Sequence, residues 1–173
     1  MAVDFVEQEP FRGIKRGLCA YVTYQMACQM EQSFSEYSLY EPILRILVAG
    51  GYSVECEVAL GKKVPRRGDH KRLDFVAKPL PQKGDLFCEE RGSFALEVKW
   101  VKELRPKIKP DLKKLTDYRT QQGGEAFLCV FGQKHFIEGL ELGDANLGEV
   151  GRLVCTNFGK SRNEYSCRIF DLK

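Results

Sequence analysis

Residues 94–100 read FALEVKW, a run of apolar residues that includes one glutamate and one lysine two positions apart. Because a β-strand has a side-chain period of two, Glu97 and Lys99 are predicted to point to one side, with Val98 pointing to the other. Two interpretations of this strand are open. It is either a half-buried edge strand with a solvated charged face, or a strand whose glutamate and lysine belong to a site.

The composition is typical of a globular protein. Of the 173 residues, 43% are hydrophobic and 29% are charged, and the length suits one domain with its own core. No run approaches the roughly 18 to 20 apolar residues of a membrane span. The first residues, MAVDFVEQEP, lack the basic and apolar regions of a signal peptide. We therefore expect a single domain over residues 1–173, without a membrane segment and in the cytoplasm.

The cysteines are predicted to be reduced thiols of the core. Their number is odd, they are widely scattered and no CxxC motif occurs, which argues against both a disulfide framework and a zinc site. They are Cys19, Cys28, Cys56, Cys88, Cys129, Cys155 and Cys167.

The hydrophobic pattern predicts a mixed order of helices and strands. Helices are expected at 13–32, 35–51 and 107–119, strands at 53–60, 72–78, 93–101 and 125–132, and in the tail a strand near His135, a short helix at 144–156 and a strand at 164–170. Consecutive strands favour hairpins, and the third helix then carries the chain across to a parallel strand buried on both faces. This order predicts an α/β sandwich with a mixed central sheet.

Asp74 lies in the middle of the predicted strand RLDFVA, where aspartate is normally depleted. If this strand is adjacent to FALEVKW, Asp74 lies beside Glu97 and Lys99 on one sheet face. Two buried carboxylates at such a distance are costly without a cation between them, and their hard oxygens suit magnesium or manganese. A nearby lysine could orient or deprotonate a water molecule, or stabilise a phosphate charge. These groups together are suited to metal-assisted hydrolysis of a phosphodiester.

The pair RLDFVA and FALEVKW resembles the D…ExK signature of the PD-(D/E)XK nuclease superfamily, which includes restriction endonucleases, Holliday-junction resolvases and repair nucleases. The order of elements over about residues 35–131 is also similar to the core of that family. The resemblance implies a restriction-endonuclease-like α/β/α sandwich and a Mg²⁺- or Mn²⁺-dependent endonuclease. One departure is that Leu73 precedes Asp74, so the proline of the family name is missing.

Transferred to this sequence, the family motif implies that Asp74, Glu97 and the carbonyl of Val98 bind the metal, with Lys99 as the catalytic lysine. The preceding helix usually supplies a further acidic residue, which here is Glu36 or Glu41. Glu36 follows the apolar face of the helix and is slightly favoured on geometry, whereas Glu41 has about the spacing of the resolvase-like members.

Other candidate residues follow from the resemblance and from the distribution of charge along the sequence. Gln121 ends the helix after the motif, where some relatives place a polar residue near the site, although a role at the helix end is an equal alternative. Two basic clusters flank the motif and could contact phosphates, with a solvated loop and a polar helix face as the alternatives. They comprise Lys62, Lys63, Arg66, Arg67, Lys71 and Arg72, and Lys107, Lys109, Lys113 and Lys114.

The sequence therefore predicts a metal-dependent nuclease that acts on nucleic acid, with DNA favoured over RNA and a homodimer in keeping with the family. The competing hypothesis is a non-catalytic module that binds nucleic acid or protein on the same fold, in which Asp74, Glu97 and Lys99 form a structural ion cluster. Metal binding by the two carboxylates distinguishes these hypotheses.

Overall fold

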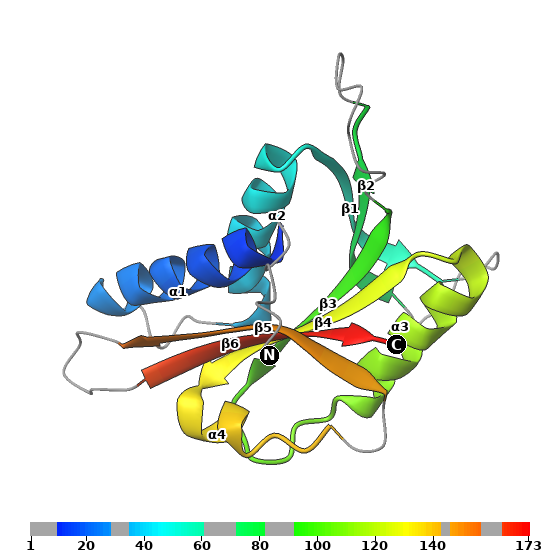
Figure 1. Ribbon diagram of the computed structural model, residues 1–173. Helices are drawn as coiled ribbons and strands as arrows, with labels where there is room; N and C mark the ends of the chain where they lie inside the picture. The colour runs from blue at the N-terminus through cyan, green and yellow to red at the C-terminus, as the bar shows by residue number, and fades with distance from the viewer. Residues whose placement is uncertain (1–9, 29–34, 61–71, 82–91, 143–145, 157–163) are drawn as a thin grey trace, which may run out of the picture.

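The computed structural model describes residues 10–28, 35–60, 72–81, 92–142, 146–156 and 164–173 (Figure 1). In chain order these residues form α1 (Phe11–Ala27), the 3-10 helix η2 (Glu36–Leu39), α2 (Tyr40–Ala49), β1 (Tyr52–Ala59), β2 (Arg72–Pro79), β3 (Phe94–Val101), α3 (Lys109–Gln122), β4 (Glu125–Gln133), α4 (Lys134–Glu138), β5 (Leu147–Thr156) and β6 (Glu164–Leu172). None of the helices in these ranges is long and apolar enough to span a membrane.

The strands form one mixed sheet in the order β1-β2-β3-β4-β6-β5. The pair β3 and β4 is parallel, and the other neighbouring pairs are antiparallel. The expected hairpins and the α3 crossover to a parallel strand are thus confirmed. Since β3 lies in the interior of the sheet and Glu97 is only 1% exposed, the interpretation of FALEVKW as an edge strand with a solvated face is wrong.

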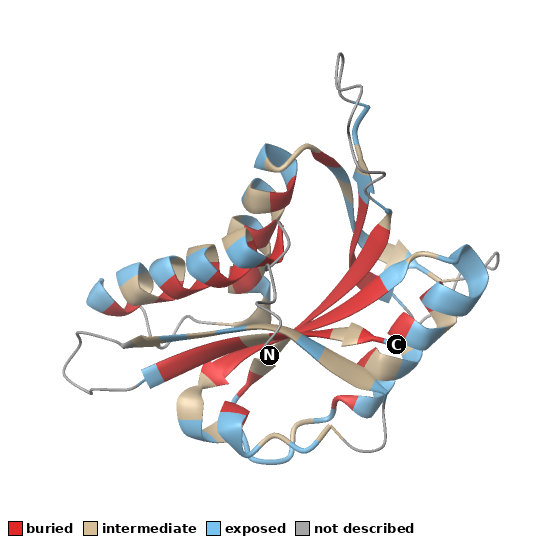
Figure 2. Ribbon diagram, in the orientation of Figure 1, coloured by how far each residue is buried: buried red, intermediate tan, exposed pale blue. Residues whose placement is uncertain are grey.

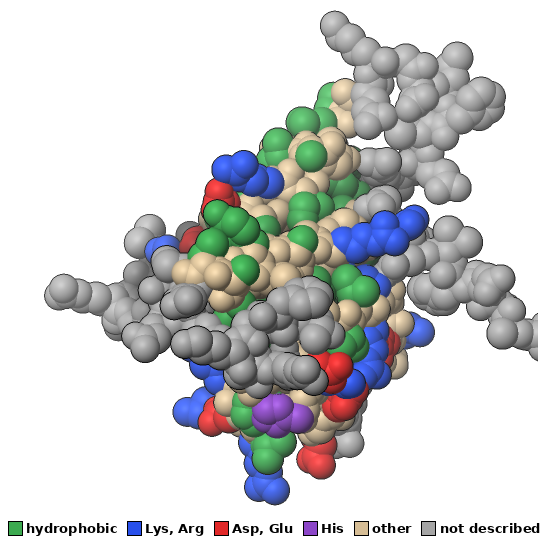
Figure 3. All heavy atoms as spheres, turned by 90° about the vertical axis from the view of Figure 1, so that its left-hand side faces the viewer, with side chains coloured by type: hydrophobic (Ala, Val, Ile, Leu, Met, Phe, Trp, Pro, Cys, Tyr) green, Lys and Arg blue, Asp and Glu red, His purple; other side chains and the backbone are tan. Residues whose placement is uncertain are grey.

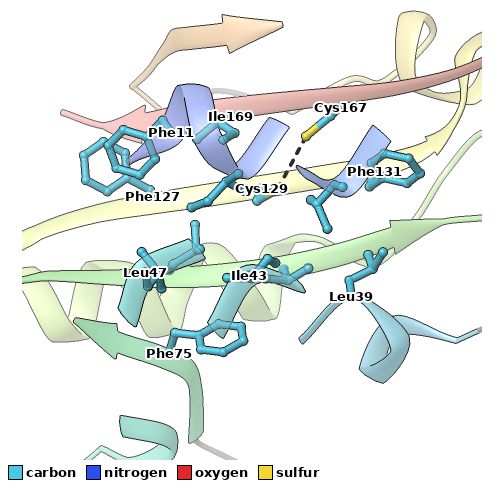
Figure 4. Close-up of a cluster of buried hydrophobic side chains, with 14 of the residues drawn as sticks. Phe11, Leu39, Ile43, Leu47, Phe75, Phe127, Cys129, Phe131, Cys167 and Ile169 are labelled. Atoms are coloured by element: carbon cyan, nitrogen blue, oxygen red, sulfur yellow. Dashed lines mark hydrogen bonds between the residues drawn. The ribbon is translucent and has the colours of Figure 1, made fainter. Parts of the chain in front are cut away.

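Helices cover both faces of the sheet (Figure 1), and the buried residues concentrate on the strands and the inner faces of the helices (Figure 2). On one face, Ile43 and Leu47 of α2 and residues of α1 pack against the cluster that contains Phe75 and Leu96 (Figure 4). On the other face, α3 and α4 pack against a second cluster that includes Leu128. The molecule is therefore an α/β protein with a six-stranded mixed sheet between two helical layers.

The apolar sequence of β4 follows from its interior position. Alternate residues enter the two clusters, so this strand is buried on both faces, as predicted. Gly132 occupies a point of close approach between β4 and β3. A Cβ atom there would lie 2.3 Å from the carbonyl oxygen of Val101, which leaves room for glycine only.

Two predictions for the C-terminal tail are wrong. The residues around His135 form the short helix α4 instead of a strand, and residues 147–156 form strand β5 instead of a helix. A helix of one turn is too short to show a periodicity of its own. In β5 the alternation is interrupted by an irregular register between Glu149 and Gly151, so the strand period is lost. The final strand, β6, is confirmed.

The helix predictions are largely confirmed within the described residues, whereas the prediction for the cysteines holds only in part. The first helix spans 11–27, and the second begins as a 3-10 turn at Glu36 before α2 starts at Tyr40. Cys19, Cys129 and Cys167 are buried free thiols, but Cys28 and Cys56 are exposed, so the prediction that all are core residues is wrong. Cys88 lies outside the described residues.

Candidate functional site at a fork between two strands

The candidate site lies where β2 and β3 stop pairing. The ladder between these strands ends at Phe75 and Leu96, so Asp74 and Glu97 are the next residues in register. Beyond this point β2 continues to pair with β1, and β3 continues to pair with β4 up to Val101. The two carboxylates therefore lie at a fork in the sheet.

Side chains take over the hydrogen bonds of the interrupted ladder. The backbone amide of Val98 donates to Oδ2 of Asp74 at 2.7 Å, and the amide of Asp74 donates to Oε1 of Glu97 at 3.2 Å. The hydroxyl of Tyr40, from α2, donates to Oδ1 of Asp74 at 2.5 Å. Each carboxylate is thus fixed to the backbone of the neighbouring strand, and the two lie next to each other as the sequence predicted.

Helix α3 contributes an aspartate and a lysine to the same site. The ammonium of Lys114 forms an ion pair with Oε2 of Glu97 and a second one with Oδ1 of Asp111, at 3.1 Å. Because Leu115 and Tyr118 bury one face of α3 against the sheet, the residues beside that face are carried to the fork. The prediction that Lys114 is a surface contact for phosphate does not match this position, since its ammonium is bound within the site.

Lys99 connects the two helical layers. Its ammonium lies 3.5 Å from Oε2 of Glu36, on η2, and 3.5 Å from Oδ2 of Asp111, on α3. Glu36 also accepts a hydrogen bond from the amide of Trp100 at 3.0 Å. Glu41 instead pairs with Arg45 at 2.8 Å on the exposed side of α2. Of the two candidate glutamates, the structure brings Glu36 to Lys99.

The buried carboxylates have raised pKa values. Burial and the negative charge of Asp74 raise the pKa of Glu97 from 4.5 to about 8, although Lys114 partly offsets the effect. The pKa of Asp74 is also raised by burial, against the lowering effect of the hydrogen bonds from Tyr40 and the amide of Val98. The raised pKa values mean that the surroundings do not fully stabilise the ionised forms of Glu97 and Asp74.

The lysines remain charged at neutral pH. Burial by itself would lower the pKa of Lys99, but the carboxylates of Asp111 and Glu36 outweigh it and raise the pKa. In the same way Glu97 and Asp111 raise the pKa of Lys114 against the effect of its burial. A lysine held in this form acts as a positive charge and a hydrogen-bond donor, and not as a base.

The charges and donor atoms of the site fit a divalent cation. Four carboxylates and two ammonium groups take part in the contacts above, which leaves two negative charges (−4 + 2 = −2) when all six groups are ionised. The N–H of Val98 points into the fork, where it donates to Asp74. The N–H and C=O of one residue in a strand point to the same side, so the carbonyl of Val98 is a further oxygen donor for the site. Oxygen donors of this kind suit Mg²⁺ or Mn²⁺. No group of three or more His, Cys, Asp or Glu side chains suited to a metal occurs among the described residues, so water would complete the shell.

The remaining predicted residues are less directly connected with the site. Arg72 is exposed at the start of β2, two residues before Asp74, and Lys107, Lys109 and Lys113 are exposed near the beginning of α3. Gln121 is exposed in the last turn of α3, about two helical turns beyond Lys114. The other predicted basic residues, which are Lys62, Lys63, Arg66, Arg67 and Lys71, lie outside the described residues. On the face shown in Figure 3, basic and acidic side chains are interspersed.

Three residues near the fork were not predicted for the site. Asp111 and Tyr40 are two of them, and a D-x-x-K spacing on α3 was the available signal for Asp111. Glu57 gave no signal in the sequence. It is the one non-glycine residue with positive φ (53°) in the described chain, and its Oε1 is 3.4 Å from the Tyr40 hydroxyl. The β1–β2 register passes from the Cys56–Phe75 pair to the Val58–Leu73 pair without it. Such a backbone is unusual for glutamate.

Comparisons of the chain with protein-family models, with curated proteins and with solved structures found no match.

Proposed function

We propose that this protein is a Mg²⁺- or Mn²⁺-dependent nuclease of the restriction-endonuclease-like fold that hydrolyses phosphodiester bonds, in DNA in preference to RNA. The observation that carries the proposal is the pair of buried carboxylates, Asp74 and Glu97, at a fork of the sheet with excess negative charge and with Lys99 nearby.

We assign a separate role to each residue of the fork. Asp74, Glu97 and the carbonyl of Val98 would hold the cation, which, when bound, activates water and polarises the phosphate. Tyr40 orients Asp74 through its hydroxyl. Lys99 is protonated, so it stabilises the negative charge that develops at the phosphate, and Glu36 and Asp111 hold its ammonium in place.

Binding of the substrate is assigned to the basic residues around the fork. Arg72 at the start of β2 and the exposed lysines at 107, 109 and 113 near the beginning of α3 supply positive charge, and a role for the basic residues of 61–71, which lie outside the described residues, stays a prediction from the sequence. We place the enzyme in the cytoplasm, and a homodimer stays a prediction from the family resemblance.

The experiment that tests the proposal compares the wild-type protein with Lys99→Ala on single- and double-stranded DNA and RNA, in Mg²⁺, Mn²⁺ or a chelator. Lys102→Ala is the matched control, since Lys102 is exposed three residues further along. We expect cleavage that needs the metal, is retained in Lys102→Ala and is lost in Lys99→Ala. Cleavage that persists in the chelator, or is unchanged in Lys99→Ala, would contradict the proposal.

One observation favours the competing function, a non-catalytic binding module. All four carboxylate oxygens of Asp74 and Glu97 already have partners within the protein, as a structural ion cluster requires. Calorimetric titration with Mn²⁺ separates the two functions, because a structural cluster binds no metal and a nuclease site must. An absence of both metal binding and cleavage would favour the module.

A further inference from the structure

The four partners of the two carboxylates differ in how readily they can leave. Two are backbone amides, of Val98 and Asp74, and one is the neutral hydroxyl of Tyr40. The fourth is the ammonium of Lys114, which carries a full charge on a flexible side chain. A cation that binds at Glu97 competes directly with this ammonium.

Asp111 is placed to accept Lys114 if it leaves Glu97. Its Oδ1 already lies 3.1 Å from the Lys114 ammonium, on the same helix, so a small rotation of the side chain exchanges one carboxylate for the other. Its Oδ2 is buried and accepts no hydrogen bond from the described residues, although the ammonium of Lys99 lies 3.5 Å away. Asp111 thus has capacity for a closer contact than it makes here.

We propose that the Lys114 ammonium occupies Glu97 in the metal-free protein and moves to Asp111 when a divalent cation is taken up. This inference rests on the proposed function, because it requires that Glu97 and Asp74 bind a metal. It assigns Lys114 a positioning role. The Glu97 side chain is only 1% exposed, and Lys114 keeps it paired until the cation arrives. Because Lys114 competes with the cation for Glu97, it also weakens the affinity of the site for that cation.

The test measures Mn²⁺ affinity by calorimetry in the wild-type protein, Lys114→Met and Lys113→Met. Lys113 is the matched control, because it is the neighbouring lysine and is exposed. We expect Lys114→Met to bind Mn²⁺ about tenfold more tightly than the wild type, with Lys113→Met within about twofold. Unchanged or weaker binding in Lys114→Met overturns the inference while leaving the nuclease proposal intact. If no variant binds metal, both fall.

A double-mutant cycle separates this exchange from a general effect of charge. Asp111→Asn removes the second acceptor, so it should weaken Mn²⁺ binding in the wild-type background and have much less effect when Lys114 is already methionine. An equal loss in both backgrounds overturns the exchange. If Lys114→Met does not fold without metal, Lys114→Gln retains a hydrogen-bond donor for Glu97 without the charge, and it should show the same tighter binding.

Discussion

The carboxylate of Asp74 accepts a hydrogen bond from the amide of Val98 at 2.7 Å, across the point where β2 and β3 separate. This contact explains why an aspartate is tolerated in the middle of a strand between Leu73 and Phe75. Its side chain supplies the acceptor that the missing ladder would have offered to β3. The same contact fixes the carboxylate next to Glu97, so the interruption of the sheet and the assembly of the site have one cause.

The hydroxyl of Tyr40 should contribute to stability through Asp74. Tyr40→Phe keeps the ring that packs on Phe75 at 4.8 Å but leaves Oδ1 of a buried carboxylate without its donor. We expect a loss of about 1–3 kcal/mol in the free energy of unfolding, measured in urea. Tyr37→Phe is the control, because Tyr37 is 71% exposed and should change stability by less than about 0.5 kcal/mol. Equal effects of the two substitutions would contradict this role.

The metal-free protein should lose stability as the pH rises. Glu97 releases its proton at about 4.5 in the unfolded chain but retains it up to about 8 in the folded protein. Between these values the folded state binds more protons, so the free energy of unfolding falls from pH 4.5 to pH 8. Urea unfolding in a chelator across this range should show the fall, and Glu97→Gln should reduce its slope.

A matched glutamate provides the control for this pH dependence. Glu41→Gln alters an exposed side chain that pairs with Arg45, so it should retain the wild-type slope. Added Mg²⁺ should reduce the fall in the wild type, because a bound cation stabilises the ionised form of Glu97. A slope that Glu97→Gln leaves unchanged would assign the pH dependence to other groups.

The two candidate glutamates of the second helical segment should differ in their effect on cleavage. Glu36 holds the ammonium of Lys99, so Glu36→Gln should lower the rate of metal-dependent cleavage by about 10–100-fold, as expected for a group that orients an active-site side chain. Glu41→Gln should leave the rate unchanged. Comparable losses in both variants would place the acidic residue of this segment elsewhere.

The sequence allowed the arrangement within each strand to be predicted, because it depends on local periodicity. Glu97 and Lys99 share a face of β3, and Asp74 lies beside Glu97, as the alternation and the hairpin order required. The class of fold and the parallel strand β4 followed from the same patterns.

The partners of those residues could not be predicted, because they depend on packing between elements. Glu97 pairs with Lys114 rather than with Lys99, since α3 docks with its Asp111 and Lys114 toward the fork. In a linear sequence this lysine is indistinguishable from its exposed neighbour Lys113. The positive φ of Glu57 likewise gave no signal in the sequence.

The close approach of β3 and β4 should be essential for holding the end of β3 that carries Lys99. In Gly132→Ala the new Cβ would lie 2.3 Å from the carbonyl oxygen of Val101, and because this atom belongs to the backbone it cannot move aside as a flexible side chain could. We expect a loss of about 1–3 kcal/mol in the free energy of unfolding, measured in urea. Gly139→Ala is the control, since the nearest atom there, the carbonyl oxygen of His135, is 3.5 Å away. If Gly132→Ala were as stable as Gly139→Ala, β3 and β4 would have to lie further apart at this point, and the position of Lys99 relative to Glu36 and Asp111 would need to be revised with them.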